Sequence, residues 1–261
     1  MQHEIYKYST GDLPCEGFVV RKADLDLPAP VVVICHHWNG RDELMDQRAK
    51  EIAAMGYIAF AVDLYGNHAT ATEPDTCASF MNPMMADRAM LRERLQATIA
   101  AAKRIPGADG KRIVVMGFCF GGLCALDVAR AGIPGVVGVA SFHGLFTPPG
   151  VGPQSNITAK VLVMHGFDDP LAPQDSMLAL TKELTSARAN WEIVLFGNTG
   201  HAFTNPRAQD KANGMAFCAT MSQRAFARLE TFLRECFHMS NRVSDAPVLA
   251  GNQAHHQSID P

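Results

Sequence analysis

The sequence predicts an α/β fold in which a mostly parallel sheet of eight strands is covered by helices on both faces. From residue 31 onward, short apolar runs alternate with longer segments of helical periodicity, and parallel sheets with two covered faces produce this pattern. Residues 112–131 add a second observation, because a buried strand there passes through a glycine-rich turn directly into a helix. We expect residues 1–237 to form a single α/β domain.

Eight segments have the composition of strands, since each is a short run rich in β-branched or aromatic residues and bounded by turn residues. They cover residues 5–8, 16–23, 31–36, 57–62, 112–116, 136–142, 160–165 and 191–196. The first two are close in sequence and alternate polar with apolar residues. They are therefore expected to form an antiparallel edge of the sheet.

Five segments show helical periodicity, with apolar residues three or four positions apart. They cover residues 42–55, 87–104, 122–131, 174–187 and 215–237. Residues 64–86 form the longest excursion between elements; they are too few for a separate cap domain and are expected to line the rim of a pocket. Periodicity is lost after residue 237, so residues 238–261 are predicted to be a C-terminal tail, packed on the surface or disordered.

Composition and charge exclude several classes of function. The 261-residue chain is 48% hydrophobic and carries a formal net charge of -3 without a cluster of Lys or Arg, so neither nucleic acid nor an anionic membrane is expected as a partner. No apolar run approaches the roughly 20 residues that span a bilayer, and the chain does not open on a secretory signal. Seven cysteines without framework spacing favour free thiols. We expect a cytoplasmic monomer or homodimer.

Cys119 stands at the sharpest predicted turn, Gly117-Phe118-Cys119-Phe120-Gly121-Gly122. In the related G-x-S-x-G turn the nucleophile occupies a strained backbone position, and the flanking glycines let strand and helix approach closely. The N-terminus of the following helix favours the thiolate, which is the form that attacks a carbonyl carbon. Because cysteine is also a common packing residue, the turn alone leaves a structural role for Cys119 equally open.

Two further motifs follow later strands of the predicted sheet. His165-Gly166-Phe167-Asp168-Asp169-Pro170-Leu171-Ala172-Pro173 is an acidic turn, and Gly197-Asn198-Thr199-Gly200-His201-Ala202-Phe203 contains a glycine-flanked histidine. Ligands of parallel sheets bind beyond the carboxyl ends of the strands, where all three motifs fall. The chain order Cys, Asp, His is the order in which α/β-hydrolases supply nucleophile, orienting acid and general base.

These motifs, together with Val62-Asp63-Leu64-Tyr65-Gly66, give the chain a resemblance to the dienelactone hydrolase (carboxymethylenebutenolidase) family. Its members are α/β-hydrolases with a Cys-Asp-His triad, and the similarity runs over residues 16–237. The resemblance implies that Asp169 is the triad acid, with Asp168 as the alternative. It also implies an oxyanion hole formed by the backbone N–H groups of Trp38 and Phe120, which agrees with the positive end of a helix at Phe120.

By this resemblance the protein is a carboxylic ester hydrolase that cleaves small esters or lactones through an acyl-cysteine intermediate and needs no cofactor. His201, oriented by Asp169, would share the proton of Cys119 and later activate water. Two other hypotheses stay open. One is a thioesterase or acyltransferase that uses the same triad, and the other is a non-catalytic binding protein on the same fold.

The chain departs from the family at a position that helps to activate the thiol and at two positions that hold a substrate carboxylate. His37 stands where the family has a glutamate, and Asn67 and Asn205 stand where it has arginines. Arg41 and Arg207 are nearby in sequence but out of register. The preferred substrate is therefore expected to be a small ester or lactone whose recognition does not depend on a carboxylate clamp.

The remaining polar and aromatic residues near the motifs have both a functional and a structural interpretation. The candidate pocket residues are His37, Phe118, His143, Asn67 and Asn205. His143 and Phe118 could equally be structural, and His165 is expected to be a hydrogen-bonded core histidine. His36 and His37 are adjacent at a strand end, so their side chains should point to opposite sides, and no metal site is expected. Four cysteines are expected to be packing residues, namely Cys35, Cys124, Cys218 and Cys236.

Overall fold

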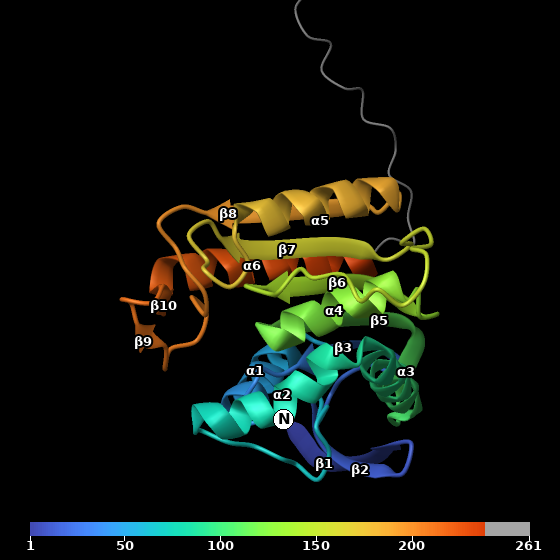
Figure 1. Ribbon diagram of the computed structural model, residues 1–261. Coiled ribbons are helices and arrows are strands. Elements are labelled where there is room, and N and C mark those ends of the chain that lie inside the picture. The colour runs from blue at the N-terminus through green and yellow to red at the C-terminus, as the bar shows by residue number, and fades with distance from the viewer. Residues whose placement is uncertain (238–261) are drawn as a thin grey trace, which may run out of the picture.

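The structure is a computed structural model that describes residues 1–237 (Figure 1). The predicted C-terminal tail, residues 238–261, lies outside the described residues. An eight-stranded sheet has the strand order β1-β2-β4-β3-β5-β6-β7-β8. These strands are β1 Gln2–Thr10, β2 Leu13–Arg21, β3 Ala29–Cys35, β4 Ile58–Ala61, β5 Ala108–Phe118, β6 Val136–Phe142, β7 Lys160–Gly166 and β8 Trp191–Phe196.

The sheet is parallel from β4 to β8, and only its β1–β2 end is antiparallel. β2 pairs antiparallel with both β1 and β4, whereas β3 pairs parallel with β4 and β5, and β5 to β8 continue in parallel. This confirms the expected antiparallel edge. Because β3 and β5 to β8 all run in one direction, the loops after them meet along the same edge of the sheet.

Helices cover both faces of the sheet, as predicted (Figure 1). One apolar layer joins the sheet to α1 and α6, and the other joins it to α2, α3, α4 and α5. The helices are α1 Glu43–Ala54, α2 Pro74–Ala86, α3 Arg88–Arg104, α4 Phe120–Arg130, α5 Gln174–Ser186 and α6 Ala219–Phe237. Their starts have physical causes; the Asp42 side chain, for example, accepts hydrogen bonds from two backbone N–H groups in the first turn of α1.

Most predicted boundaries shift by a few residues, and three differences bear on the site. The last helix was expected from residue 215, but Met215–Ala216 forms a short strand, β10, that pairs with β9, Gln209–Asp210. The apolar residues of this segment fit helical spacing, but the backbone of residues 215–216 pairs with β9 in a hairpin, and α6 begins only at Ala219. The helix of the glycine turn begins at Phe120 instead of residue 122. Finally, the excursion over residues 64–86 contains α2, which has proline at its first position.

Candidate active site

Cys119 occupies a strained turn between β5 and α4, as the glycine motif predicts. Its backbone has φ 55° and ψ -115°, in a region that L-residues rarely adopt, and its side chain is partly exposed. Glycine is required on both sides of it. A Cβ at Gly117 would lie 2.1 Å from the carbonyl oxygen of Gly121, and one at Gly121 would lie 2.3 Å from the carbonyl oxygen of Cys35. The turn thus holds the thiol at the carboxyl end of β5, in front of the N-terminus of α4.

Asp169 and His201 form a buried hydrogen-bonded pair. Nδ1 of His201 lies 2.8 Å from Oδ2 of Asp169, and the two residues are 3% and 2% exposed. The other carboxylate oxygen, Oδ1, accepts backbone N–H bonds from Leu171 at 2.8 Å and Ala172 at 3.3 Å. Asp168, the alternative acid, is exposed, and its own N–H donates to Thr199 at 3.0 Å. The structure therefore brings Asp169, and not Asp168, to His201.

Adjacent strands bring this pair together from two distant motifs. β7 and β8 are parallel neighbours that end with Gly166 opposite Phe196. Beyond the strands, the N–H of Phe167 donates to Phe196 O at 2.9 Å, and the N–H of Asp168 donates to Thr199 O at 3.0 Å. The acidic turn and the histidine loop are thus attached to each other by backbone bonds, which fixes the Asp169–His201 geometry without a flexible linker.

The environment of His201 perturbs its electrostatics strongly. Its Nε2 is buried and has no hydrogen-bond partner within residues 1–237, while Nδ1 is bound to Asp169. Burial by itself lowers the pKa of His201, but the negative charge of a Cys119 thiolate and the bond to Asp169 outweigh it and raise the pKa to about 10. Such an imidazole is protonated at neutral pH.

Two further imidazoles stand beside His201 and are held neutral. The ring of His143 lies 5.1 Å from that of His201 in an edge-on arrangement and stacks on His37 at 5.9 Å. Burial lowers the pKa of His37 to about 3 and, together with the neighbouring His201, lowers that of His143 well below its usual value. Nε2 of His143 is bonded to the Thr204 hydroxyl at 2.8 Å. This part of the site is therefore polar but uncharged.

The other predicted pocket residues have different positions. Phe118 is 1% exposed and packs against Phe142 and against the rings of His37 and His143. It is therefore a buried residue beneath these two histidines. Asn67 is exposed, and its N–H donates to Pro14 O at 2.8 Å in β2, away from the Asp169–His201 pair. Asn205 is partly buried, and its Oδ1 accepts the N–H of Arg207 within its own turn. These contacts give Asn67 and Asn205 structural uses.

Neither nearby arginine is available to hold a carboxylate. Arg41 is 1% exposed, donates to Asp46 at 2.6 Å and to Glu16 O at 3.0 Å, and lies inside the protein. Arg207 is exposed and pairs with Asp42 at 2.9 Å. Both guanidinium groups are thus occupied by carboxylates of the protein itself.

The two residues expected to present backbone N–H groups follow neighbouring parallel strands, Trp38 in the loop after β3 and Phe120 in the turn after β5. Phe120 is the first residue of α4, so its N–H has no acceptor within the helix. Trp38 is partly buried in the loop after β3, and its carbonyl oxygen accepts the Tyr65 hydroxyl at 2.8 Å. His36 lies on the other side of this loop from His37, packed against Tyr65, as its position at the strand end predicts. The sequence did not reveal these contacts of Tyr65 and His36.

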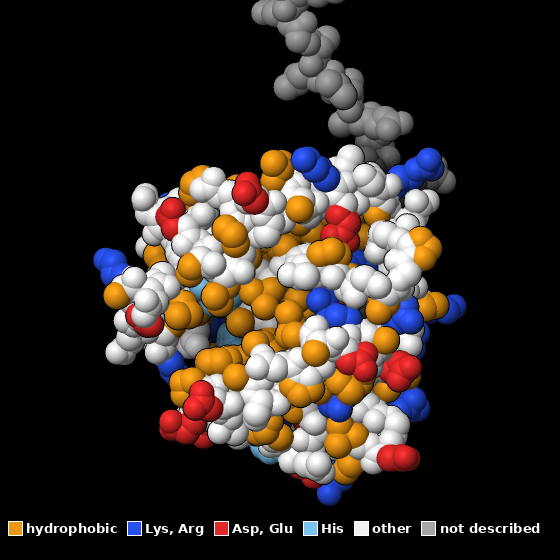
Figure 2. All heavy atoms as spheres, viewed as in Figure 1, with side chains coloured by type: hydrophobic (Ala, Val, Ile, Leu, Met, Phe, Trp, Pro, Cys, Tyr) orange, Lys and Arg blue, Asp and Glu red, His pale blue; other side chains and the backbone are white. Residues whose placement is uncertain are grey.

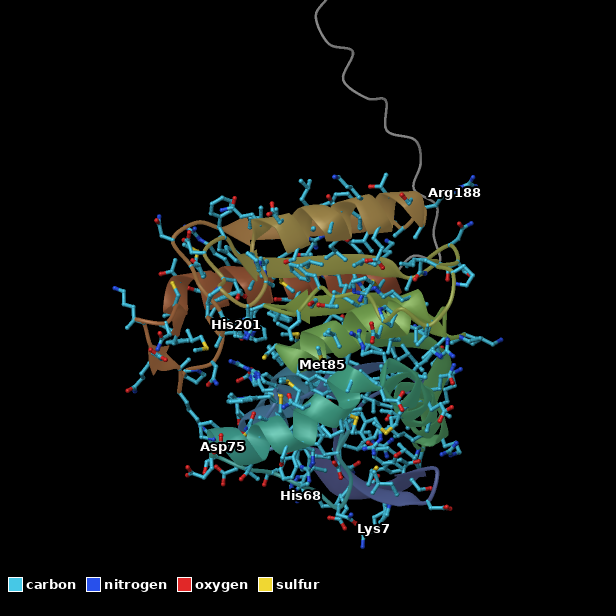
Figure 3. The ribbon with its side chains drawn as sticks, in the orientation of Figure 1. Lys7, His68, Asp75, Met85, Arg188 and His201 are labelled. Atoms are coloured by element: carbon cyan, nitrogen blue, oxygen red, sulfur yellow. The ribbon has the colours of Figure 1, made fainter. Side chains whose placement is uncertain are left out.

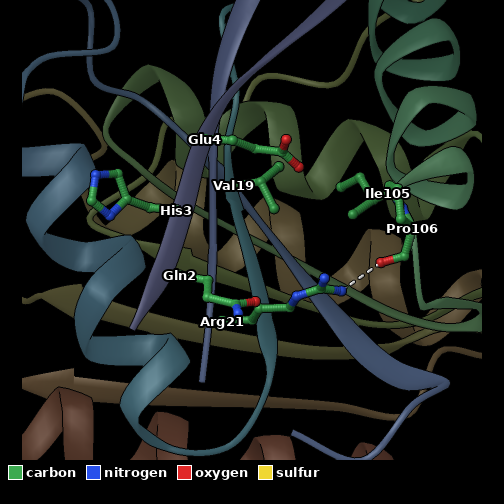
Figure 4. A pocket seen from close by; sticks show the side chains of 7 residues that line it. All are labelled: Gln2, His3, Glu4, Val19, Arg21, Ile105 and Pro106. Atoms are coloured by element: carbon green, nitrogen blue, oxygen red, sulfur yellow. Dashed lines mark hydrogen bonds between the residues drawn. The ribbon is translucent and has the colours of Figure 1, made fainter. Parts of the chain in front are cut away.

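The surface above these residues is hollowed. Figure 2 shows a depression lined by hydrophobic side chains with histidine at its floor, and Figure 3 locates His201 there, at the carboxyl end of the sheet. A separate cavity of about 160 Å³ lies at the β1–β2 edge and contains the Arg21 to Pro106 hydrogen bond of 2.7 Å (Figure 4). Because Pro106 precedes β5, that cavity lies at the opposite end of the strand from Cys119.

This sheet order, with a strained cysteine turn after β5 and an Asp–His pair after β7 and β8, is that of an α/β-hydrolase fold. The chain belongs to the dienelactone hydrolase family, whose model matches residues 15–236. This confirms the resemblance seen in the motifs. Within the described residues, no helix is long and apolar enough to cross a membrane.

Individual relatives agree with the family assignment. An uncharacterized protein of Caenorhabditis elegans is 32% identical over 157 residues, 59% of this chain and 99% of that protein. A Salmonella typhimurium protein named provisionally as a carboxymethylenebutenolidase is 27% identical over 204 residues, 74% of this chain and 73% of that protein. Among solved structures, a dienelactone hydrolase-like promiscuous phosphotriesterase from metagenomic libraries has a TM-score of 0.84 at 30% identity, over 90% of this chain and 98% of that one. The chain is therefore a hydrolase of the dienelactone hydrolase type.

Proposed function

We propose that the protein hydrolyses small neutral carboxylic esters or lactones through an acyl-enzyme intermediate on Cys119. The observation that carries this proposal is the buried Asp169–His201 hydrogen bond of 2.8 Å beside a cysteine held at φ 55°. A packing cysteine does not need a strained backbone, and a buried imidazole with a free Nε2 has no structural use for that nitrogen. Both features are required by nucleophilic catalysis.

In the first half of the reaction, the Cys119 thiolate attacks the carbonyl carbon of the ester and forms a carbon–sulfur bond. The carbonyl π electrons move to oxygen, and this oxyanion accepts hydrogen bonds from the backbone N–H groups of Trp38 and Phe120. Collapse of the tetrahedral intermediate breaks the carbon–oxygen bond, and the departing alkoxide takes the proton of the His201 imidazolium. The products are an alcohol, a thioester on Cys119 and a neutral His201.

In the second half, the same imidazole acts as a base. Once Cys119 is acylated, its negative charge is gone, and with it the largest influence that raises the pKa of His201. His201 is then able to accept a proton from water, and the resulting hydroxide attacks the thioester. Expulsion of the thiolate releases the carboxylic acid and restores the thiolate–imidazolium pair. One water molecule is consumed and no other reactant is needed.

The charges around the site favour a neutral substrate. His37 and His143 are uncharged at neutral pH, and Arg41 and Arg207 are paired with protein carboxylates. Arg48, the guanidinium nearest to His37, already donates to Glu51 at 2.8 Å and to Thr204 O at 2.9 Å. A substrate carboxylate beside the two uncharged imidazoles would lose its water without gaining an unpaired arginine, which costs several kcal/mol. The family's anionic lactone substrates are therefore expected to be poorer for this chain than neutral esters of the same size.

Burst kinetics test the proposal. With p-nitrophenyl acetate, rapid mixing should release one equivalent of p-nitrophenol per enzyme before the steady state, because acylation precedes hydrolysis of the thioester. Cys119→Ala should lose both the burst and the turnover while keeping the circular dichroism of the wild type. Turnover that survives in Cys119→Ala would overturn the proposal. Transfer of the acetyl group to an added alcohol or thiol in preference to water would favour the acyltransferase alternative.

A second activity, phosphotriester hydrolysis, is suggested by the 30% identity to the promiscuous phosphotriesterase. The same thiolate would attack phosphorus in a neutral dialkyl aryl phosphate and expel the aryloxide. This leaves a dialkylphosphoryl group on the sulfur of Cys119, which water then removes. An uncharged histidine wall suits such a neutral ester. Release of p-nitrophenol from a diethyl p-nitrophenyl phosphate by the wild type and not by Cys119→Ala would support this activity, and stoichiometric inactivation without turnover would contradict it.

A further inference from the structure

We propose that His36 and Tyr65 are positioning residues that aim the backbone N–H of Trp38 at the oxyanion. The inference rests on the proposed function, since it concerns the stabilisation of the tetrahedral intermediate on Cys119. It is carried by two hydrogen bonds that connect the loop after β3 to the loop after β4, and by a third within the loop after β3. Neither residue is expected to touch the substrate.

His36 holds the peptide group that contains the N–H of Trp38. Nε2 of His36 lies 3.2 Å from the N–H of Leu64 and accepts it, so the proton of this neutral imidazole is on Nδ1. Nδ1 in turn lies 2.6 Å from the carbonyl oxygen of His37 and donates to it. The side chain is fully buried, and burial lowers its pKa, which keeps the ring in this one neutral form.

The bond to the His37 carbonyl fixes the direction of the next N–H. The carbonyl of His37 and the N–H of Trp38 belong to the same planar trans peptide group, in which C=O and N–H point in opposite directions. Because His36 holds the oxygen on its own side of the loop, the N–H of Trp38 is directed to the other side. His37 and His143 lie on that side, next to His201.

Tyr65 holds the following peptide group. Its hydroxyl donates to the carbonyl oxygen of Trp38 at 2.8 Å, and burial raises the pKa of Tyr65, so the hydroxyl remains a donor. The peptide planes on both sides of the Trp38 Cα are thereby held, one by His36 and one by Tyr65. The hydrogen bond from His36 to the His37 carbonyl also polarises the peptide group that contains the N–H of Trp38, and this makes that N–H a stronger donor.

The same tyrosine supports the second N–H donor. The ring of Tyr65 stacks on that of Phe120 with centroids 5.9 Å apart and planes 21° apart. Its backbone is held in turn by Asp63, whose Oδ1 accepts the N–H of Tyr65 at 3.2 Å. The ring of Phe80 in α2 also packs on the Tyr65 ring, with centroids 5.4 Å apart. Tyr65 therefore contacts both residues that carry the proposed oxyanion donors.

Tyr65→Phe is the sharpest test, because it removes one hydroxyl and keeps the ring stacked on Phe120. Loss of an oxyanion donor outright lowers kcat by about 10²–10³; we expect loss of a support for that donor to lower it by about tenfold, with KM unchanged. His36→Asn retains a donor near the Nδ1 position, so its kcat should fall less than that of His36→Leu, which retains none. Tyr57→Phe, at a buried tyrosine that packs on Phe237 instead, is the matched control and should be unchanged.

Two probes separate positioning from a general structural effect. An aryl trifluoromethyl ketone accepts the thiolate and forms a tetrahedral oxyanion, so its inhibition constant should rise by the factor by which kcat/KM falls. Alkylation by iodoacetamide forms no oxyanion, since the thiolate displaces iodide directly, and its rate should stay within about twofold of the wild type. Equal losses in both reactions, or an unchanged kcat in both Tyr65→Phe and His36→Leu, would overturn the inference. A wild type that forms no acyl-enzyme would instead refute the proposed function.

Discussion

Asp169→Asn should inactivate the enzyme by reversing the hydrogen-bond polarity of His201. Oδ1 of Asp169 faces two backbone N–H donors, at 2.8 and 3.3 Å, so an asparagine would place its carbonyl oxygen there. Its NH2 group would then face Nδ1 of His201 and force that nitrogen to accept. The proton would move to Nε2, the nitrogen that must take protons from the reactants.

The size of the effect follows from this tautomer change. The equivalent replacement in serine-based triads costs about 10⁴ in kcat, which is about 5 kcal/mol of transition-state stabilisation. Loss of the carboxylate also removes an influence that raises the pKa of His201. We expect kcat for p-nitrophenyl acetate to fall by about 10³–10⁴, with KM changed little.

Asp168→Asn is the matched control, because it makes the same chemical change one residue away. Asp168 is exposed and contributes its backbone N–H to the loop, which the substitution leaves intact. Its kcat should stay within about twofold of the wild type. Both variants should be compared with the wild type in thermal melts. A large fall in kcat for Asp168→Asn, together with a nearly normal kcat for Asp169→Asn, would refute the assignment of Asp169 as the triad acid.

Three other predictions concern the nucleophile, the charge of His201 and the substrate. His201→Ala should abolish ester hydrolysis without unfolding the protein, and Cys119→Ser should retain little activity, because an alcohol needs a stronger base than a thiol; substantial turnover in either would contradict the triad. Folded His201, with a pKa of about 10, keeps a proton that the unfolded imidazole releases near pH 6.5. Its contribution to stability is complete below pH 6.5 and is lost as the pH rises to about 10, with a slope of at most about 1.4 kcal/mol per pH unit. Urea melts at a series of pH values should show this loss in the free energy of unfolding of the wild type, and a weaker dependence on pH in Cys119→Ala. Equal dependence on pH in the two proteins would contradict the ion pair. A neutral short-chain ester should have a kcat/KM equal to or above that of a matched ester with a free carboxylate, and a hundredfold preference for the acid would show that Arg41, Arg207 or another cation binds it.

The strands and the three catalytic candidates could be predicted from sequence for a common reason. Parallel strands are buried on both faces, so each is a continuous apolar run that composition reveals. Residues that follow such strands must meet at one edge of the sheet, and this brings Cys119, Asp169 and His201 together without any knowledge of the loops. The buried pair of Asp169 and His201 follows directly from β7 and β8 being neighbours.

The features that escaped prediction depend on contacts between loops. α2 packs an apolar stripe on the core, formed by Cys77, Phe80, Met81, Met84 and Met85, but Pro83 lies inside this helix and conceals it in the sequence. The strand over residues 215–216 exists only because the chain folds back on β9. Asn67 and Asn205 occupy positions where the family has arginines, but their surroundings depend on turns that no spacing rule describes. The bond between Tyr65 and Trp38 likewise joins two loops 27 residues apart in sequence.

The most direct test of the account is to locate the acyl group. The wild type is mixed with p-nitrophenyl acetate, quenched with acid within the burst phase, digested and examined by peptide mass spectrometry. Acetylation should be confined to Cys119 and absent from Cys35, Cys124 and the other thiols, and it should disappear as the thioester hydrolyses. An acetyl group on any other residue of a turning-over enzyme, or rapid turnover with no covalent adduct, would contradict the central claim.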